Sequence, residues 1–236
     1  MFFSIVIACY NSSAYIEKAI LSVLNQTFNN YELIIIDGAS TDGTLNILQK
    51  YSSKIKFISE KDSGVYDAMN KALKIAEGDF IFFLGSDDTF FDTTVLEKVA
   101  KKISNKDSVY YGDVYVTKIR KLYWGKFSSY KLAIGNISHQ SLFYPKCIYK
   151  KYQYNLSYKI LADYVYNLSI YKRIPFTYID ETICIYSYEG ISSTKRDELF
   201  LKNIDSIIVK ELGITHLIAR KIYHLLVRIK TLIKNG

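Results

Sequence analysis

The sequence predicts an α/β fold with a mainly parallel central sheet and helices on both faces. Apolar runs such as residues 80–84 contain no polar position, which is typical of a strand buried on both faces of a sheet. Between these runs lie segments of about a dozen residues whose apolar positions recur at helical spacing. Strands that alternate with helices in this way form right-handed βαβ units, and therefore a mainly parallel sheet.

The first part of the chain, residues 1–106, repeats the unit of strand, turn and helix. Residues 2–8 are a predicted buried strand, and a polar turn then leads into a helix with apolar residues at positions 16, 19, 20, 23 and 24. The second strand, 31–36, ends in a turn where Gly38 allows a tight bend and Ser, Thr and Asp can cap a helix through Leu48. The remaining elements are a strand at 56–59, a helix at 63–76, a strand at 79–84 and a helix at 93–103.

After Asp107 the pattern changes, and we expect a second lobe there. Residues 108–117 alternate loosely, which predicts a strand across the edge of the sheet. A basic and aromatic segment follows, and Ser187 begins a small, polar segment that we expect to form a mobile loop near the site. The other predicted elements are a segment at 137–144, in which Ser138, His139 and Gln140 precede an apolar run, a helix at 160–171 and a strand at 176–185. We therefore divide the chain into lobes 1–106 and 107–205 and a tail, 206–236.

Composition narrows the class of protein and of partner. The 236 residues are 49% hydrophobic, enough for a sizeable core, and the net charge of +8 favours nucleotides, nucleic acid or an anionic membrane face. Cys9, Cys147 and Cys184 lack metal-ligand spacing, so we expect buried, reduced thiols in a cytosolic protein. No charged leader precedes the first strand, and no apolar run approaches the roughly 20 residues of a membrane span. We expect a protein that is neither exported nor membrane-spanning.

The C-terminal segment predicts a long amphipathic helix with a basic polar side. Arg220, Lys221, Arg228, Lys230 and Lys234 lie mostly off its apolar stripe. The stripe could pack on the second lobe, as most such helices do, or lie on an anionic membrane surface. It consists of Ile214, Leu217, Ile218, Ile222, Leu225, Leu226, Ile229, Leu232 and Ile233.

Polar turns follow three of the predicted strands, at residues 8–11, 37–40 and 85–88. Open α/β sheets bind ligands at the carboxyl ends of their strands, so we expect these turns to meet at one ligand-binding edge. The adjacent carboxylates of Asp87 and Asp88 suit a hard divalent cation, although they could instead cap the helix that begins near Asp92.

The turns favour one kind of nucleotide site over others. The chain has neither a GxGxxG after the first strand nor a GxxxxGK[ST], which leaves dinucleotide binding poorly supported and excludes a phosphate loop. A carboxylate such as Asp37 can instead accept a hydrogen bond from a base or ribose, while a cation on Asp87 and Asp88 neutralises a diphosphate. These features together predict a nucleotide-sugar site.

Six segments, in this order, carry a resemblance: SIVIACYN, ELIIIDGASTDGT, SGVYDAMNKAL, EGDFIFFLGSDD, SHQSLFY and LADY. The chain resembles family 2 glycosyltransferases, and more closely the bacterial enzymes that add sugars during capsule, O-antigen or exopolysaccharide synthesis. The resemblance covers roughly residues 2–188. It implies the nucleotide-diphospho-sugar transferase fold of type A, Mg²⁺ or Mn²⁺ as cofactor, and inversion at the anomeric carbon.

By position, the resemblance implies a nucleotide-sugar-binding lobe at 1–106. Asp88 is favoured as the metal ligand, with Asp87 on ribose or metal-bound water. The sequence departs from the pattern at Gly38 and Gly85, where many relatives carry an acid. Helix capping or a solvated polar face is an equally good interpretation of two of the implied donor residues, those in the helix at 63–76. The implied donor-binding residues are Ala8, Cys9, Tyr10, Asn11, Asp37, Asp67, Asn70, Ser86 and Asp87.

The second lobe, 107–205, is the implied acceptor-binding lobe. Inverting transfer needs a base that takes the proton of the acceptor hydroxyl, and Asp163 matches the catalytic acid position of the family. An ordinary helix acid paired with a Lys is the alternative. His139 and Gln140 are expected to bind the acceptor, although His139 could also bind diphosphate or metal, or serve only the structure.

The combined prediction is an inverting, metal-dependent hexosyltransferase. Its expected donor is a UDP-linked sugar, and its expected acceptor is a lipid-linked glycan or polysaccharide at the inner face of the cytoplasmic membrane. A nucleotidyltransferase is an alternative, but it would carry a Gly-rich, basic loop after the first strand, and CYNSSAY is not one. A non-catalytic nucleotide-binding or membrane-binding module is another. We expect no nucleic-acid partner, because the basic segments contain no recognised motif.

Overall fold

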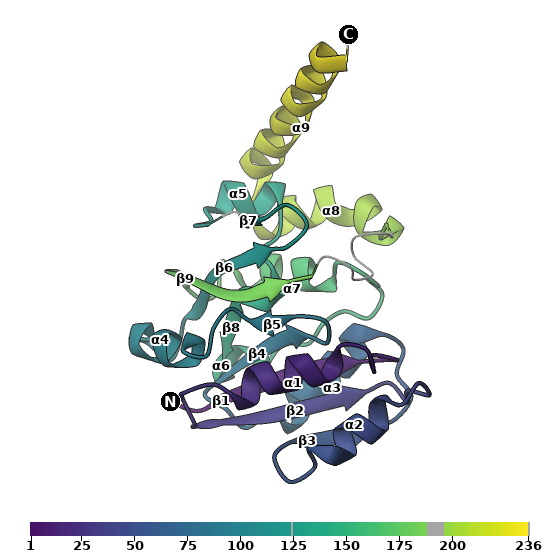
Figure 1. Ribbon diagram of the computed structural model, residues 1–236. Coiled ribbons are helices and arrows are strands. Elements are labelled where there is room, and N and C mark those ends of the chain that lie inside the picture. The colour runs from purple at the N-terminus through teal and green to yellow at the C-terminus, as the bar shows by residue number, and fades with distance from the viewer. Residues whose placement is uncertain (124, 188–195, 236) are drawn as a thin grey trace.

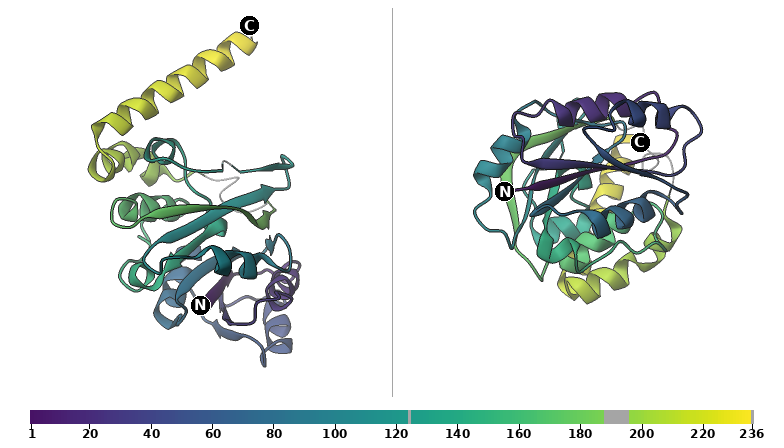
Figure 2. Two further views of the ribbon diagram at one scale, coloured as in Figure 1. Left: turned by 90° about the vertical axis from the view of Figure 1, so that its left-hand side faces the viewer. Right: turned by 90° about the horizontal axis from the view of Figure 1, so that it is seen from below.

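The computed structural model describes residues 1–123, 125–187 and 196–235. Figure 1 shows a central sheet with helices packed against it and a long C-terminal helix that projects from one end. Figure 2 shows the same layers from two further sides. The observed fold confirms the predicted α/β class.

Four parallel strands form the half of the sheet that comes first in the sequence. They are β1 (Phe3–Cys9), β2 (Tyr31–Asp37), β3 (Lys56–Ser59) and β4 (Phe80–Gly85). β1 lies between β2 and β4, and β3 pairs with the outer side of β2. In the register, Cys9 lies opposite Asp37 and Ala8 lies opposite Gly85. The three polar turns therefore begin at the same edge of the sheet, as predicted.

The rest of the sheet is mixed, and one prediction about it is wrong. Its strands are β5 (Thr89–Phe90), β6 (Val109–Val116), β7 (Lys121–Leu122), β8 (Leu142–Pro145) and β9 (Phe176–Tyr186). Along the described chain the strand order is β3-β2-β1-β4-β8-β6-β9-β5, with β7 on β6. β6, which was expected across a sheet edge, runs inside the sheet between β8 and β9. Tyr110 and Tyr111 point to opposite faces and are both buried, so the strand needs cover on both sides.

Helices cover both faces, and each face has its own hydrophobic cluster. Ile5 and Ile7 of β1 point into one cluster, and Val6 between them points into the other. On the first face lie α1 (Ile16–Leu24), α2 (Thr44–Lys50) and α4 (Val95–Lys102). The second face is covered by α3 (Val65–Ile75), α5 (Ser129–Ile134), α6 (Lys146–Tyr149), α7 (Ala162–Ile170) and α8 (Glu198–Glu211).

The predicted lobes share one sheet, because β8, from the second lobe, pairs with β4, from the first. The predicted start of the tail at residue 206 falls within α8, and the projecting helix α9 (Ile214–Asn235) begins later. Both boundaries are therefore less sharp in space than in the sequence.

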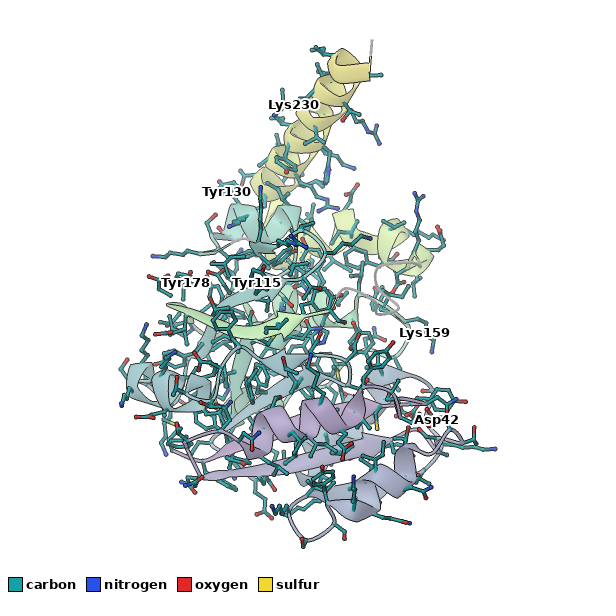
Figure 3. All side chains as sticks on the ribbon, viewed as in Figure 1. Asp42, Tyr115, Tyr130, Lys159, Tyr178 and Lys230 are labelled. Atoms are coloured by element: carbon teal, nitrogen blue, oxygen red, sulfur yellow. The ribbon has the colours of Figure 1, made fainter. Side chains whose placement is uncertain are left out.

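Only the beginning of α9 packs on the body of the protein. The ring of His216 stacks on Tyr130 with centroids 4.2 Å apart, and the Arg220 guanidinium donates to the carbonyl oxygens of Ala133 and Ile134 at 2.6 and 3.1 Å. Figure 3 shows Tyr130 beside this start and Lys230 far out on the projecting part. The side chains from residue 221 to 233 are all exposed. Of the first residues of the apolar stripe, Leu217 packs against the cluster on the second face, whereas Ile214 and Ile218 are more than half exposed. Packing on the second lobe thus accounts for little of the stripe.

Two further observations concern predictions from composition. Among the described residues, no helix combines the length and the apolarity that crossing a bilayer would need. All three thiols are free, and Cys9 and Cys184 are buried, but Cys147 is exposed, so the expectation of buried thiols is wrong for Cys147. Cys147 lies at the start of α6, on the outer side of that short helix, where it does not reach the cluster beneath.

Candidate active site

Asp37 ties the ends of three parallel strands together. Its side chain is fully buried, and its carboxylate accepts hydrogen bonds from the Ser40 N–H at 3.0 Å, the Ser59 hydroxyl at 2.6 Å and the Ser40 hydroxyl. The Cys9 thiol lies 3.7 Å from the same carboxylate, and burial together with Asp37 raises the pKa of that thiol. Cys9 therefore stays a neutral thiol. The carboxylate of Asp37 already accepts hydrogen bonds from residues at the strand ends. Its expected contact with base or ribose remains a prediction.

The turn after β1 borders the same edge. Asn11 has a φ of 48°, a left-handed conformation that Asn tolerates, and its N–H donates to the Ser40 hydroxyl at 2.8 Å. The Ser12 and Ser86 hydroxyls lie 3.2 Å apart and connect the turns after β1 and β4. Tyr10 is 63% exposed and offers an aromatic face at the edge.

The two candidate donor residues of α3 make local contacts. The Asp67 carboxylate accepts the Ser63 N–H at 3.0 Å, which is the helix-capping role left open by the sequence. Asn70 is buried, and its amide exchanges two hydrogen bonds with the backbone of Tyr154, at 2.8 and 2.9 Å. The structure thus gives both residues structural partners, and their contact with the donor remains a prediction.

Asp87 and Asp88 lie beyond β4 and are not helix caps. Asp88 is 1% exposed, and its two oxygens accept the Ser187 N–H at 2.9 Å and the Gln140 side-chain amide at 3.2 Å. The Asp87 carboxylate accepts the Ser187 hydroxyl at 2.5 Å. The N-cap residue of α4 is Thr94, and Asp92 accepts the Thr94 N–H at 2.7 Å in the turn before the helix.

The chemistry of this acidic pair fits a cation. Burial and the neighbouring Asp87 raise the pKa of Asp88 to about 7. Within the described ranges, neither carboxylate forms an ion pair with Lys or Arg. The described residues contain no group of three or more His, Cys, Asp and Glu side chains that could hold a metal. A Mg²⁺ or Mn²⁺ ion here would thus take one or two carboxylates from the protein and its other ligands from substrate and water, as Mg²⁺ commonly does.

Gly85 makes room for this arrangement. A Cβ atom on Gly85 would collide with Oδ2 of Asp88 and lie 3.2 Å from Oδ1 of Asp87. The space that an acidic side chain would need at residue 85 is therefore filled by the carboxylate of Asp88.

Asp163, at the start of α7, makes four polar contacts. One oxygen accepts the Tyr164 N–H at 2.8 Å and lies 3.0 Å from the Tyr66 hydroxyl, whose single proton also faces the Ile160 carbonyl oxygen at 2.6 Å. The other accepts the Asn136 amide at 2.9 Å and contacts His139 Nδ1 at 3.2 Å. Burial and the Asp163 charge raise the pKa of Tyr66, so its hydroxyl remains a donor. Among the described residues Asp163 pairs with no Lys, which removes the alternative of an ordinary helix ion pair.

One short turn connects the two acidic centres. The 3₁₀ turn η1 (His139–Ser141) points His139 at Asp163 and the next residue, Gln140, at Asp88. The sequence predicted these four residues for the site, and the structure brings them together. It also adds three partners that sequence reasoning missed, because an isolated Asn, Tyr or Ser carries no motif: Asn136, Tyr66 and Ser187. Ser187 begins the predicted mobile loop, and the rest of that segment, 188–195, lies outside the described residues.

Comparisons with known proteins identify the family of this chain. The family model described as "Glycosyl transferase family 2" matches residues 4–178. A "PGL/p-HBAD biosynthesis glycosyltransferase" of Mycobacterium bovis is 32% identical over 213 residues, which cover 86% of this chain and 83% of the relative. A "Putative teichuronic acid biosynthesis glycosyltransferase TuaG" of Bacillus subtilis is 44% identical over 89 residues, covering 36% and 35% of the two chains.

Solved structures share the fold. TarS of S. aureus (residues 1–349), in complex with UDP-GlcNAc, superposes with a TM-score of 0.73 at 21% identity, covering 90% of this chain and 68% of that one. This chain spans 40% of a longer TarS chain. A mannosyltransferase of Pyrobaculum calidifontis, in complex with GDP-Man and Mn²⁺, gives a TM-score of 0.65 at 13% identity, covering 93% and 72%. These neighbours are glycosyltransferases of type A, the fold class expected from the sequence. From the family match and the mycobacterial relative, the chain belongs to glycosyl transferase family 2 and is a glycosyltransferase.

Proposed function

We propose that this glycosyltransferase moves a hexose from a UDP-linked sugar, with inversion, to a lipid-linked glycan or polysaccharide in surface glycan synthesis. The observation that carries the proposal is the turn η1, whose adjacent residues His139 and Gln140 contact Asp163 and Asp88. Two adjacent residues thereby contact the candidate base and the candidate diphosphate site. The names of the relatives support the pathway class, and the UDP-GlcNAc bound by TarS supports the choice of donor.

On the donor side, Asp88 and Asp87 would hold Mg²⁺ or Mn²⁺. When bound there, the ion would neutralise negative charge on the diphosphate leaving group. The Gln140 amide and the Ser187 N–H each hold one oxygen of Asp88, so the orientation of the carboxylate is set before a donor arrives.

On the acceptor side, Asp163 takes the proton. The acceptor oxygen bonds to the anomeric carbon, the bond from that carbon to the diphosphate oxygen breaks, and the hydroxyl proton passes to the carboxylate. The contact of Asp163 with His139, at 3.2 Å, is the longest of its four. An acceptor hydroxyl can therefore replace His139 most easily, while the Asn136 amide and the Tyr164 N–H keep the carboxylate in position.

Release of UDP from a panel of UDP-hexoses, with and without Mn²⁺, tests this proposal. We expect slow Mn²⁺-dependent hydrolysis of at least one donor, and thermal stabilisation of the protein by UDP with Mn²⁺. Asp88→Ala should abolish both effects, whereas Asp92→Ala, which removes a carboxylate outside the site that contacts Thr94 and Lys98, should keep them. Stabilisation by another nucleotide but not by UDP would contradict the choice of donor. No response to any nucleotide sugar would contradict the donor site altogether.

We extend the proposal to a location at the inner face of the cytoplasmic membrane, with α9 on the anionic lipid surface. The apolar side chains of the projecting part, Ile222, Leu225, Leu226, Ile229, Leu232 and Ile233, are between 44% and 76% exposed. Arg228 and Lys230 lie beside them on the same helix. A stripe of apolar residues flanked by basic ones is typical of helices that lie in a membrane interface. A lipid-linked acceptor would be within reach of an enzyme bound in this way.

Leu232→Glu should weaken binding to anionic vesicles by about tenfold or more, because a buried Leu contributes about 1.5–3 kcal/mol. Thr231→Glu is the matched control. It adds the same charge, but the helical period of 3.6 residues places residue 231 on the side of α9 that faces away from the centre of the apolar stripe. Cosedimentation with phosphatidylglycerol vesicles and with phosphatidylcholine vesicles measures both variants. Equal binding of Leu232→Glu and the unaltered protein to vesicles would exclude the stripe as the membrane contact. If the unaltered protein instead forms a concentration-dependent dimer that Leu232→Glu abolishes, the stripe binds a second copy of the chain.

A further inference from the structure

Asp62 occupies the space that a side chain at residue 38 would need. A Cβ atom on Gly38 would lie 2.7 Å from Oδ2 of Asp62 and 3.3 Å from Cδ2 of Tyr10. Asp62 comes from the loop between β3 and α3, so its carboxylate reaches this point from a different segment of the chain. Gly85 shows the same relation, because there the carboxylate of Asp88 fills the space of a missing side chain. At both glycines, a carboxylate is present although the residue itself has none.

The two oxygens of Asp62 have different surroundings. Oδ1 accepts the Gly64 N–H at 2.9 Å, which orients the side chain. In the part of the chain that the structure describes, Oδ2 accepts no hydrogen bond from the protein. Asp37, by contrast, is fully buried and has donors at both oxygens, the Ser40 hydroxyl at Oδ1 and the Ser59 hydroxyl at Oδ2. Of these two carboxylates at the end of β2, half-buried Asp62 is therefore the one with an oxygen free for a ligand.

Tyr10 supplies the second half of a base-binding site. Its side chain is 63% exposed, and its ring lies next to the position above Gly38 that Asp62 fills. A nucleobase can stack on an exposed aromatic ring regardless of its identity. The hydrogen bonds at its edge then decide which base is accepted.

We propose that Asp62 binds the nucleobase of the donor and selects uracil by accepting a hydrogen bond from its ring N3–H. This proposal rests on the proposed function, which requires a nucleotide at this edge. An ionised carboxylate accepts hydrogen bonds and donates none. The N3 position of uracil carries a proton to donate, whereas N3 of cytosine carries a lone pair, which a carboxylate repels. Asp62 therefore favours UDP over CDP, and Gly38 is required because a side chain at residue 38 would displace Asp62.

The affinities of UDP and CDP, measured by isothermal titration calorimetry with Mg²⁺, test the proposal. Asp62→Ala should weaken UDP binding by about 10- to 100-fold, the range for a hydrogen bond to a charged group, and affect CDP much less. Asp62→Asn should narrow the preference for UDP over CDP, because an amide can both accept from uracil and donate to cytosine. The double variant Gly38→Asp/Asp62→Ala should recover the preference, since it returns a carboxylate to the same space from β2.

Glu60→Ala is the matched control. Its carboxylate lies on the same loop and pairs with Lys71 at 2.9 Å, so its removal should leave both affinities unchanged. An equal loss of UDP and CDP affinity in Asp62→Ala, with a lower unfolding temperature, would assign Asp62 to the loop alone and overturn the proposal. Unchanged UDP binding in that variant would overturn it as well. If the unaltered protein binds no nucleotide, the proposed function itself fails, and the two failures are thereby distinguished.

Discussion

Asp163→Asn is expected to lower kcat by about 10²- to 10⁴-fold, the usual contribution of a general base, while the Kd of the donor nucleotide stays within about twofold. The amide keeps the shape of the side chain but cannot take up the acceptor proton. Donor affinity should survive because the candidate donor residues lie on other elements. Steady-state transfer rates and nucleotide titrations on the same preparation measure the two quantities.

His139→Gln distinguishes the role of His139 from that of Asp163. We expect kcat to fall by about tenfold or less, because the Gln amide can still donate to Asp163 and only the orientation of the carboxylate changes. A loss as large as that of Asp163→Asn would make the imidazole the base and Asp163 its positioning residue, against our assignment. Asn in place of Asp163 also exchanges an oxygen that accepts hydrogen bonds for an amino group, so unfolding curves must show that the variant is folded under the assay conditions.

Asp88→Asn is expected to have two large effects of opposite kind. Metal-dependent turnover should fall by about 10³-fold or more, because one carboxylate of the acidic pair is lost. The metal-free protein should at the same time gain about 1–3 kcal/mol of stability at pH 8. Active-site residues commonly cost stability in this way, because they are selected for function rather than for burial.

The stability gain follows from the pKa of Asp88. Burial and Asp87 raise this pKa to about 7, well above the roughly 3.9 of an unfolded chain. Between these values the folded protein binds a proton that the unfolded chain has released. The contribution of Asp88 is therefore full below about pH 4 and is lost as the pH rises through 7. The pKa difference corresponds to at most about 4 kcal/mol of lost stability at high pH. Asp88→Asn should recover less than this, because the Asn amino group cannot accept one of the two hydrogen bonds that the carboxylate accepts.

Urea unfolding in EDTA at pH 5 and pH 8 measures this effect. The stability of the unaltered protein should fall between these values more steeply than that of Asp88→Asn. Asp79→Asn provides a control of opposite sign. The hydrogen bond from Lys106 is the largest cause that lowers the pKa of Asp79, so its charged form stabilises the fold and its removal should destabilise the protein at pH 8. A destabilised Asp88→Asn at pH 8 would contradict the proposed origin of the raised pKa.

The first half of the fold was predictable because its strands are purely apolar and alternate with helices. Under these conditions periodicity alone separates the two kinds of element, and predicted and observed boundaries agree within about two residues. β6 was misplaced because its loose alternation is typical of an edge strand, whereas its two-sided burial depends on β8 and β9, which come later in the chain. Periodicity reports how many faces of a strand are apolar, but not which strands will pair with it.

The candidate site divides in a similar way. The sequence by itself determined which turns carry carboxylates and that these turns meet, because parallel strands end at a common edge. Only the tertiary structure decided what each carboxylate does. Asp37 turns inward because Ser59, on a neighbouring strand, donates to it, and Asp163 meets His139 because η1 lies against α7. Asp62 and Asp88 fill the spaces above Gly38 and Gly85 because the absence of a Cβ atom leaves those spaces open to side chains from other positions in the chain. Hydrogen-bond partners and empty volumes arise between segments, and so they become visible only once the chain is folded.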